Sequence, residues 1–218
     1  MKYIIFSLLG LFLACSLQAQ TLLNAKDSIS YAVGLELAKK LNSDGFTDVN
    51  LDKVKMALED VLSKREPVIN TYDAAILYAE ELRNNKEKIN ESNIEAGANF
   101  IAEKAKQPNV KALSNGIYYE VLKEGTGPKP EAGGDVTIHY EGKLIDGTVF
   151  DSSYERGKPN TFNLKRLIKG WQVALPEMPV GSKWRIYIPY DMAYGERGAG
   201  GKIKPYSALI FDIELFGI

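Results

Sequence analysis

The sequence predicts an α+β protein in two parts: an all-helical half over residues 21–107 and, over residues 108–218, a curved antiparallel β-sheet wrapped over a short helix. Two observations predict this division. Apolar residues recur at helical spacing as far as Gln107-Pro108, and after this dipeptide glycine and proline separate short runs rich in β-branched and aromatic residues. A chain of 218 residues has room for one or two such domains.

The composition excludes several classes of protein. With 45% apolar and 25% charged residues, the chain is neither disordered, collagen-like nor a polytopic membrane protein. Its 27 basic and 28 acidic residues give a net charge of −1, so the basic excess typical of nucleic-acid binding is missing and we expect no nucleic-acid partner. One cysteine excludes an intrachain disulfide and a multi-cysteine metal site, and one histidine excludes a His-based zinc site unless carboxylates supply the remaining ligands. We expect neither a metal nor another cofactor.

Residues 1–20 have the features of a secretory signal peptide. Lys2 provides a positive start, and residues 3–14 form an apolar run that is too short for a membrane span. Cleavage after Ala19 competes with a lipoprotein-like box around Cys15, and an uncleaved N-terminal anchor is a third alternative. We therefore expect an exported protein that is located in the periplasm or, if Cys15 is lipidated, in the outer membrane as a lipoprotein.

Two short helices follow. The first is predicted by an apolar stripe at four-residue spacing and ends at the Ser-Asp-Gly sequence of residues 43–45. Its stripe consists of Ile29, Val33, Leu37 and Leu41. The second is predicted by an apolar stripe, with Asn50 as its N-cap and Pro67 as its expected terminator. This stripe consists of Leu51, Val54, Leu58, Val61 and Leu62.

The third helix is predicted from Thr71 to about Lys106, a length of about 50 Å. Its first part is apolar on one face, but residues 83–93 are polar apart from Ile89. A stretch that is polar all round indicates a solvated stalk between two packed ends.

Helices of this size bury little apolar surface by themselves. We therefore expect residues 21–70 to complete their core against a second copy, as a symmetric homodimer. The alternative is a monomeric helical hairpin that folds back on its own stalk.

The second half carries four strand patterns and one short helix. The strands are expected at residues 117–122, 136–140, 184–188 and 208–216, and the helix within residues 164–175. The glycine-rich stretch of residues 195–201 lacks the Lys-Ser/Thr ending of a phosphate-binding loop, so it predicts a hairpin loop instead.

Taken alone, the polar and aromatic residues of this half leave alternatives open. His139 in a strand is more typical of packing than of catalysis. Asp151 before two serines is typical of a turn, although it could also line a cleft. The scattered aromatic residues fit an ordinary core or an apolar pocket with a wet rim.

Five blocks in this half are similar to FKBP-type peptidyl-prolyl isomerases, in the same order. They lie at residues 136–144, 146–153, 168–171, 188–195 and 209–215. The helical half, with residues 31–37 and its long third helix, resembles the dimerisation domain of the macrophage infectivity potentiator and related periplasmic foldases. The resemblance covers nearly all of the chain after residue 20.

The resemblance implies an apolar pocket for a prolyl ring, with Trp171 as its floor. The residues implied in catalysis are Tyr140, Phe150, Asp151, Trp171, Tyr194 and Phe211. Those implied in substrate binding are Arg156, Phe162, Leu167, Ile168 and Ile203. Tyr194 would donate a hydrogen bond at the rim, and the Ile168 backbone N–H and the Asp151 carboxylate would be polar contacts. Arg156 would pair with Asp151 and Tyr140.

The implied activity is peptidyl-prolyl cis–trans isomerisation that helps exported proteins fold, together with chaperone activity. The substrates would be unfolded or proline-containing polypeptides, and a macrolide is an implied ligand. A dimeric holdase with secondary isomerase activity is the alternative, and an inert FKBP fold is a third. Asn160 and Lys202 depart from the family pattern toward greater polarity, which bears on substrate breadth and on macrolide affinity.

Overall fold

The computed structural model describes residues 24–218. The expected signal peptide and Cys15 lie outside this range. The chain divides into two compact units between Val49 and Asn50, and helix α1 belongs to the first unit while all other elements belong to the second. The third helix ends at Ala105 and the first strand begins at Val110, whereas the boundary between two domains at residues 107 and 108 remains a prediction.

Helix α1 (Ala25–Ser43) begins at its N-cap Asn24, whose side chain accepts a hydrogen bond from the Asp27 N–H at 2.9 Å. The helix ends where residues 43–45 predicted, and Gly45 has a φ of 81°. No residue of α1 is buried. Its helical period is confirmed, but Ile29 and Val33 of its apolar stripe are exposed, and Leu37 and Leu41 are partly buried.

Helices α2 (Leu51–Leu62) and α3 (Thr71–Ala105) also begin at asparagine caps, Asn50 and Asn70. The expectation that Pro67 terminates α2 is wrong. The helix ends at Leu62 because Lys64 adopts a left-handed conformation with φ 54°, and the Arg65 N–H bonds back to the Asp60 carbonyl at 2.8 Å. The predicted long helix α3 is confirmed, and most of its middle part is exposed.

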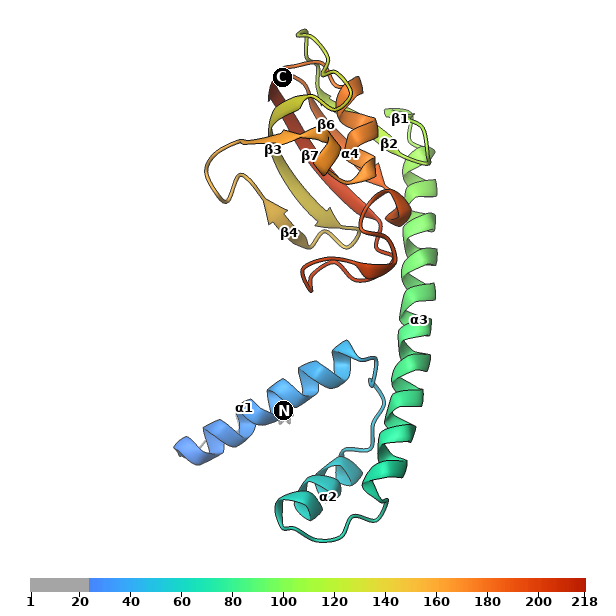
Figure 1. Cartoon of the computed structure of the whole chain (residues 1–218), viewed down its shortest axis with the longest axis vertical. Helices are drawn as coiled ribbons and strands as arrows, with labels where there is room; N and C mark the ends of the chain where they lie inside the picture. Colours follow the sequence, from blue (N-terminus) through green and yellow to red (C-terminus); the bar gives the residue numbers. More distant parts are fainter. Residues whose placement is uncertain (1–23) are drawn as a thin grey trace, which may run out of the picture. The chain divides into compact units, whose positions relative to one another are not determined.

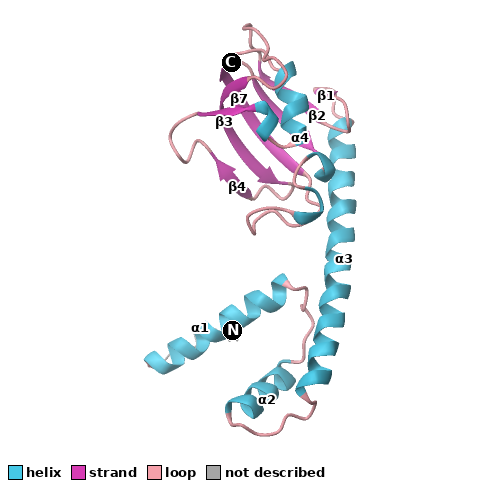
Figure 2. Ribbon diagram, in the orientation of Figure 1, coloured by secondary structure: helices cyan, strands magenta, loops and turns pink. Residues whose placement is uncertain are grey.

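The second half forms one antiparallel sheet, as Figure 2 shows. The strand order is β1-β2-β6-β7-β3-β4, and β5 also pairs with β3. The strands are β1 (Val110–Ala112), β2 (Tyr118–Lys123), β3 (Asp135–Leu144), β4 (Val149–Ser152), β5 (Asn160–Asn163), β6 (Lys183–Ile188) and β7 (Leu209–Gly217). The four strand predictions correspond to β2, β3, β6 and β7. The sequence analysis missed β1, β4 and β5, because three or four residues are too few to show a period.

One short helix covers the inner face of this curved sheet. Helix α4 (Lys169–Ala174) follows a 3-10 turn (Leu164–Arg166), within the range predicted for a helix. Its Trp171 and Ala174 share one core with Ile138, Ile186 and Ile213 of the sheet. The α+β fold class with a sheet wrapped over a short helix is thus confirmed.

Within residues 24–218, no helix combines the length and the apolar character that crossing a membrane requires.

Candidate active site

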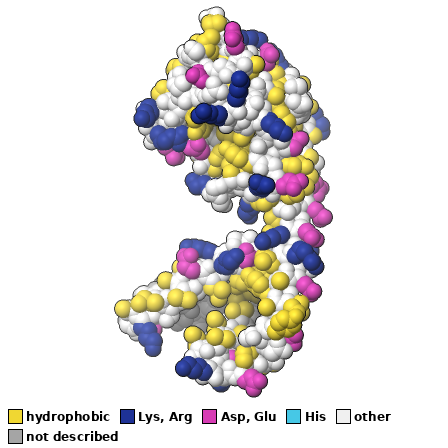
Figure 3. All heavy atoms as spheres, in the orientation of Figure 1, with side chains coloured by type: hydrophobic (Ala, Val, Ile, Leu, Met, Phe, Trp, Pro, Cys, Tyr) yellow, Lys and Arg dark blue, Asp and Glu magenta, His cyan; other side chains and the backbone are white. Residues whose placement is uncertain are grey.

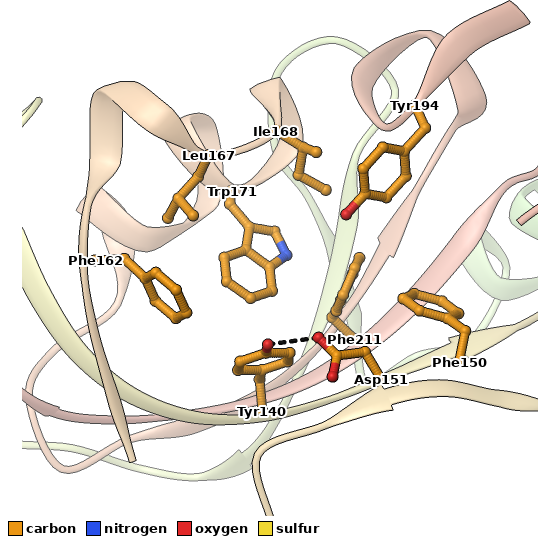
Figure 4. Close-up of a pocket in the computed structure, with 9 residues that line it drawn as sticks. All are labelled: Tyr140, Phe150, Asp151, Phe162, Leu167, Ile168, Trp171, Tyr194 and Phe211. Atoms are coloured by element: carbon orange, nitrogen blue, oxygen red, sulfur yellow. Dashed lines mark hydrogen bonds between the residues drawn. The ribbon is translucent and has the colours of Figure 1, made fainter. Parts of the chain in front are cut away.

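A shallow hollow of about 210 Å³ opens on the inner side of the sheet, next to α4 (Figure 4). It is lined by Tyr140, Phe150, Asp151, Phe162, Leu167, Ile168, Trp171, Tyr194 and Phe211. These nine residues come from separate stretches of the second half. The structure therefore brings together most of the residues that the resemblance singled out, including every one implied in catalysis.

Strand β3 contributes Tyr140 to the wall of the hollow. Its side chains alternate between the buried inner face and the partly exposed outer face, and Tyr140 falls on the inner face after Val136 and Ile138. Gly142 falls on the same face, beneath Phe150 and Phe211. A Cβ at Gly142 would lie 2.5 Å from the Phe150 ring and 2.7 Å from the Phe211 ring, so only glycine leaves room for both.

Gly142 is a site residue that the sequence analysis missed. A glycine inside an otherwise regular strand was the available signal, because it often marks the close approach of another group. The approaching group here is the aromatic wall of the hollow itself.

The aromatic rings hold one another edge to face. Trp171 is 4% exposed at the floor, and its ring centroid lies 5.2 Å from that of Tyr140 and 4.9 Å from that of Phe211. Phe150 meets Phe211 in the same way at 5.6 Å. Such contacts favour fixed ring orientations, so the hollow exists before any ligand arrives.

The rim is polar on one side. The Tyr140 hydroxyl donates to Oδ2 of Asp151 at 2.6 Å and accepts from Nη2 of Arg156 at 2.7 Å. Arg156 also forms an ion pair with Asp151. The three side chains form a closed network above the floor, with the geometry that the resemblance implied.

The surroundings of these side chains shift their pKa values and so fix which of them are protonated at neutral pH. Burial raises the pKa of Tyr140 to about 12, and its hydrogen bond to Asp151 adds to this effect. Burial also opposes ionisation of Asp151, but hydrogen bonds from Tyr140 and Arg156 outweigh it and lower the pKa of the carboxyl. Burial, followed by the charge of Asp151, raises the pKa of Tyr194. Asp151 is therefore a carboxylate, and both tyrosines are protonated, at neutral pH.

Strand β4 presents Phe150 and Asp151 to the hollow, so Asp151 lies in a strand rather than in the turn that its serines suggested. Buried Ser153 fixes this segment to β3, because its hydroxyl accepts from the Tyr140 N–H at 2.7 Å. His139 also contacts the Ser153 hydroxyl and stacks on Tyr154 at 4.4 Å. His139 does not line the hollow and has the packing role expected of it.

Some expected residues lie elsewhere. Ile203 does not line this hollow but a smaller neighbouring one of about 110 Å³, which it shares with Phe150 and Lys202. Asn160, which departs from the family pattern, begins β5 opposite Ile138 and is not among the residues that line the hollow. The stretch of residues 195–201 belongs to a loop closed by a bridge between Ala199 and Ile203, which confirms the expected hairpin.

The arrangement defines a class of protein. The lining residues include no nucleophile–base pair, and they form an apolar, aromatic-walled hollow with a carboxylate and hydroxyls at its edge. Such a site binds and orients a small apolar ring next to polar backbone. It is suited to catalysis through differential binding rather than through a covalent intermediate.

Comparisons with known proteins agree with this class. The family model of the FKBP-type peptidyl-prolyl cis-trans isomerase matches residues 127–216. The domain amino terminal to FKBP-type peptidyl-prolyl isomerase matches residues 26–121. The two matches together span both the helical half and the sheet.

Named relatives cover most of the chain. "Outer membrane protein MIP" of Legionella longbeachae is 34% identical over 100% of this chain and 97% of its own length. The FKBP-type 22 kDa peptidyl-prolyl cis-trans isomerase of Escherichia coli (strain K12) is 37% identical, over 87% of this chain and 93% of its own. The crystal structure of FkpA from Escherichia coli superimposes with a TM-score of 0.67 at 29% identity, covering 90% of this chain and 97% of that one. The chain therefore belongs to the FKBP-type peptidyl-prolyl cis–trans isomerases and is an enzyme of that class.

Proposed function

We propose that the aromatic hollow binds the prolyl ring of an X-Pro segment and accelerates its isomerisation by stabilising the twisted amide without covalent chemistry. The convergence of Tyr140, Phe150, Asp151, Trp171 and Tyr194 around one solvent-reachable hollow is the observation that supports this proposal. The substrates are unfolded or proline-containing polypeptides. A macrolide presenting a similar ring competes for the same hollow.

The physical basis is the electronic change on rotation. Turning the C–N bond removes amide resonance, which creates a barrier of about 20 kcal/mol. The twisted amide has a less dipolar carbonyl and a more pyramidal nitrogen than the planar form. An apolar site therefore stabilises the twisted form relative to the planar one, which is the differential binding that catalysis needs. A rate gain of about 10⁵ corresponds to roughly 7 kcal/mol.

The lining residues then have separate roles. Trp171 supports the ring from below while the aromatic walls hold it, and the carbonyl before the proline turns. The Ile168 N–H and the Tyr194 hydroxyl donate to substrate carbonyls, since Tyr194 is 39% exposed at the rim. Asp151 orients this edge electrostatically and is not a general acid, because its lowered pKa keeps it ionised.

The test is the cis-to-trans relaxation of a short X-Pro peptide. We expect wild type to accelerate it, and Asp151→Ala and Phe150→Ala to reduce kcat/KM by about tenfold or more, beyond any loss of stability. Glu155→Ala and Phe216→Ala are the matched controls, since both side chains are exposed and neither lines the hollow. Equal losses of rate and stability would reduce Asp151 and Phe150 to core residues, and well-folded wild type without activity would end the proposal.

We further propose that residues 21–70 form a homodimer and that the protein acts on exported polypeptides in the periplasm or at the outer membrane. Large apolar side chains of this region face solvent: Val33 is 65% exposed, Leu62 81% and Val68 80%. A monomeric soluble protein rarely exposes so many together, so a second copy is the occupant that a symmetric assembly provides. Two hollows on one dimer raise the local concentration of sites for an unfolded chain.

A holdase function is the second candidate. Between α2 and the start of α3 lies an apolar hollow of about 440 Å³, lined in part by Met56, Val61, Val68 and Ile69. Figure 3 shows apolar side chains, in yellow, gathered over the helical elements. The Asp151→Ala protein separates the two functions. Full suppression of client aggregation by this isomerase-deficient variant favours the holdase, and its loss favours the isomerase.

A further inference from the structure

One face of α3 contacts the sheet domain over its last turns. Asn93, Gly97, Phe100 and Lys104 follow one another at spacings of four, three and four residues, which places them on one side of a helix. Phe100 meets the Tyr187 ring of β6 edge-on at 5.9 Å, and the Lys104 ammonium lies 5.8 Å from the centre of that ring. The last turns of α3 therefore pack against a defined surface of the domain that carries the aromatic hollow.

Toward the N-terminal side of this contact, at Asn93 and Gly97, α3 lies against a loop rather than against the sheet. The Asn93 side chain donates to the Pro205 carbonyl at 2.9 Å. Gly97 is buried, and a Cβ at this position would lie 2.9 Å from the Cβ of Ala208, which is closer than such atoms approach one another. Asn93 and Gly97 thus hold the segment of residues 205–208, which leads into β7 beside α3 in Figure 1.

The same segment is tied to the rim of the hollow. The Tyr206 N–H donates to the Gly195 carbonyl at 2.9 Å, next to Tyr194 in the chain. The ring of Tyr206 meets that of Tyr190 edge-on at 5.2 Å. These contacts close the loop of residues 195–206 at its base, and Tyr194 stands at this closure.

Tyr206 holds this position in an unusual backbone conformation. Its φ is 59°, in the left-handed region that residues with a side chain rarely adopt. A conformation of this kind persists only where surrounding contacts fix it. The contacts of α3 with Pro205 and Ala208 flank Tyr206 on both sides and supply that constraint.

We propose that Asn93 and Gly97 are positioning residues of the isomerase: through Pro205, Ala208 and the Tyr206–Gly195 closure, helix α3 holds Tyr194 at the mouth of the hollow. The inference rests on the role proposed above for the Tyr194 hydroxyl. It makes the long helix part of the catalytic unit in addition to being a connection between domains.

The contact between Gly97 and Ala208 is tested in the full-length protein by adding a methyl group at residue 97 and then removing the one at residue 208. In an unconstrained helix Gly97→Ala would increase stability, since alanine is the better helix former. Here we expect the opposite sign, a lower thermal midpoint and a loss of about threefold to tenfold in kcat/KM, because the new Cβ meets Ala208. Ala208→Gly in the Gly97→Ala background removes the clashing atom and should restore both values.

Asn93→Ala tests the hydrogen bond to Pro205 independently. We expect kcat/KM to fall by about threefold to tenfold. Asn99→Ala is the matched control, because Asn99 lies on the same stretch of α3, is exposed and lies on a different side of the helix from Asn93; we expect it to keep the wild-type rate. In a Tyr194→Phe background, Asn93→Ala should lose most of its further effect, since the hydroxyl that it positions is gone. A residue that is merely structural would not show this dependence.

The outcomes are distinct. Wild-type rates for Gly97→Ala and Asn93→Ala in an active enzyme would overturn this inference and leave the proposed function intact. A full effect of Asn93→Ala in the Tyr194→Phe background would overturn it too. Inactive wild type would overturn the proposed function and the inference together. If Gly97→Ala does not fold, the Asn93 variants decide alone.

Discussion

In the sheet domain Ile138, Ile186 and Ile213 are 0% exposed, whereas in α1 Ile29 and Val33 are each 65% exposed. The sheet curves over α4, and the apolar side chains of both are buried in one core within a single chain. Helix α1 has no buried residue of its own. The comparison shows that the sheet domain buries its apolar side chains in a core of its own, whereas those of α1 stay exposed; under the proposed dimer a second copy covers them.

The aromatic hollow lies in the sheet domain, which has a complete core of its own. Its walls are rings held edge to face on a complete core, so their positions do not require a second copy. We therefore expect mutations to separate the proposed assembly from the proposed catalysis.

The largest expected effect compares a core residue with an exposed one of the same type. Ile138→Ala should lower the free energy of unfolding of the sheet domain by about 2–5 kcal/mol, because it leaves a cavity. Both tryptophans of the chain, Trp171 and Trp184, lie in this domain, so their fluorescence in urea reports its unfolding. Ile29→Ala should leave this transition unchanged. If Ile29→Ala shifted it equally, the two regions would not be energetically independent.

The next effect sharpens the role of the exposed helices. Val33→Asp should weaken the proposed dimer by about 2 kcal/mol or more, since a charge would have to be buried in its interface. Ala38→Asp, on a different face of α1, is the control with the same charge. Light scattering over a dilution series measures the change. The rate on a small peptide should remain that of wild type for both variants, and a dimer that survives Val33→Asp would place the interface elsewhere.

The smallest expected effect concerns pH. The lowered pKa of Asp151 means that its ionised network contributes stability above the ordinary pKa of a carboxyl group and loses it as the pH falls through the lowered value. The pKa of Tyr140 is raised to about 12, so its contribution is complete below about pH 10 and is lost as the pH rises through about 12.

We therefore expect kcat/KM to remain nearly constant between about pH 5 and about pH 10. Peptide relaxation across this range measures it. A bell-shaped profile centred near neutral pH would contradict the non-covalent mechanism, because it would require a group that exchanges protons during turnover.

The helices were predictable because helix caps and apolar periodicity depend on residues that are close together in the sequence. Asn50 caps α2 through a hydrogen bond that spans only three residues, and the stripe of α1 repeats every turn. The end of α2 was less predictable: Pro67 was the visible signal, but the left-handed Lys64 terminates the helix earlier. Any residue can adopt that conformation at some cost, so the sequence carried no clear sign of it.

The candidate site was predictable from the order of its motifs rather than from any single residue. Asp151 alone indicated a turn, and only the surrounding blocks implied a hollow. Gly142 and Ser153 were overlooked because their roles depend on what approaches them: two aromatic rings in one case and the backbone of Tyr140 in the other.

The sequence by itself determined the end of α1, the starts of α2 and α3, the four longer strands, the family and the identity of most lining residues. Only the tertiary structure decided that Ile203 lies in a separate hollow and that Asn93 reaches Pro205, 112 residues away along the chain. The physical reason is range. Helix caps and hydrophobic periodicity depend on a few neighbouring residues, so the sequence shows them directly. Contacts between residues that are distant along the chain depend on how the core and the loops pack in three dimensions.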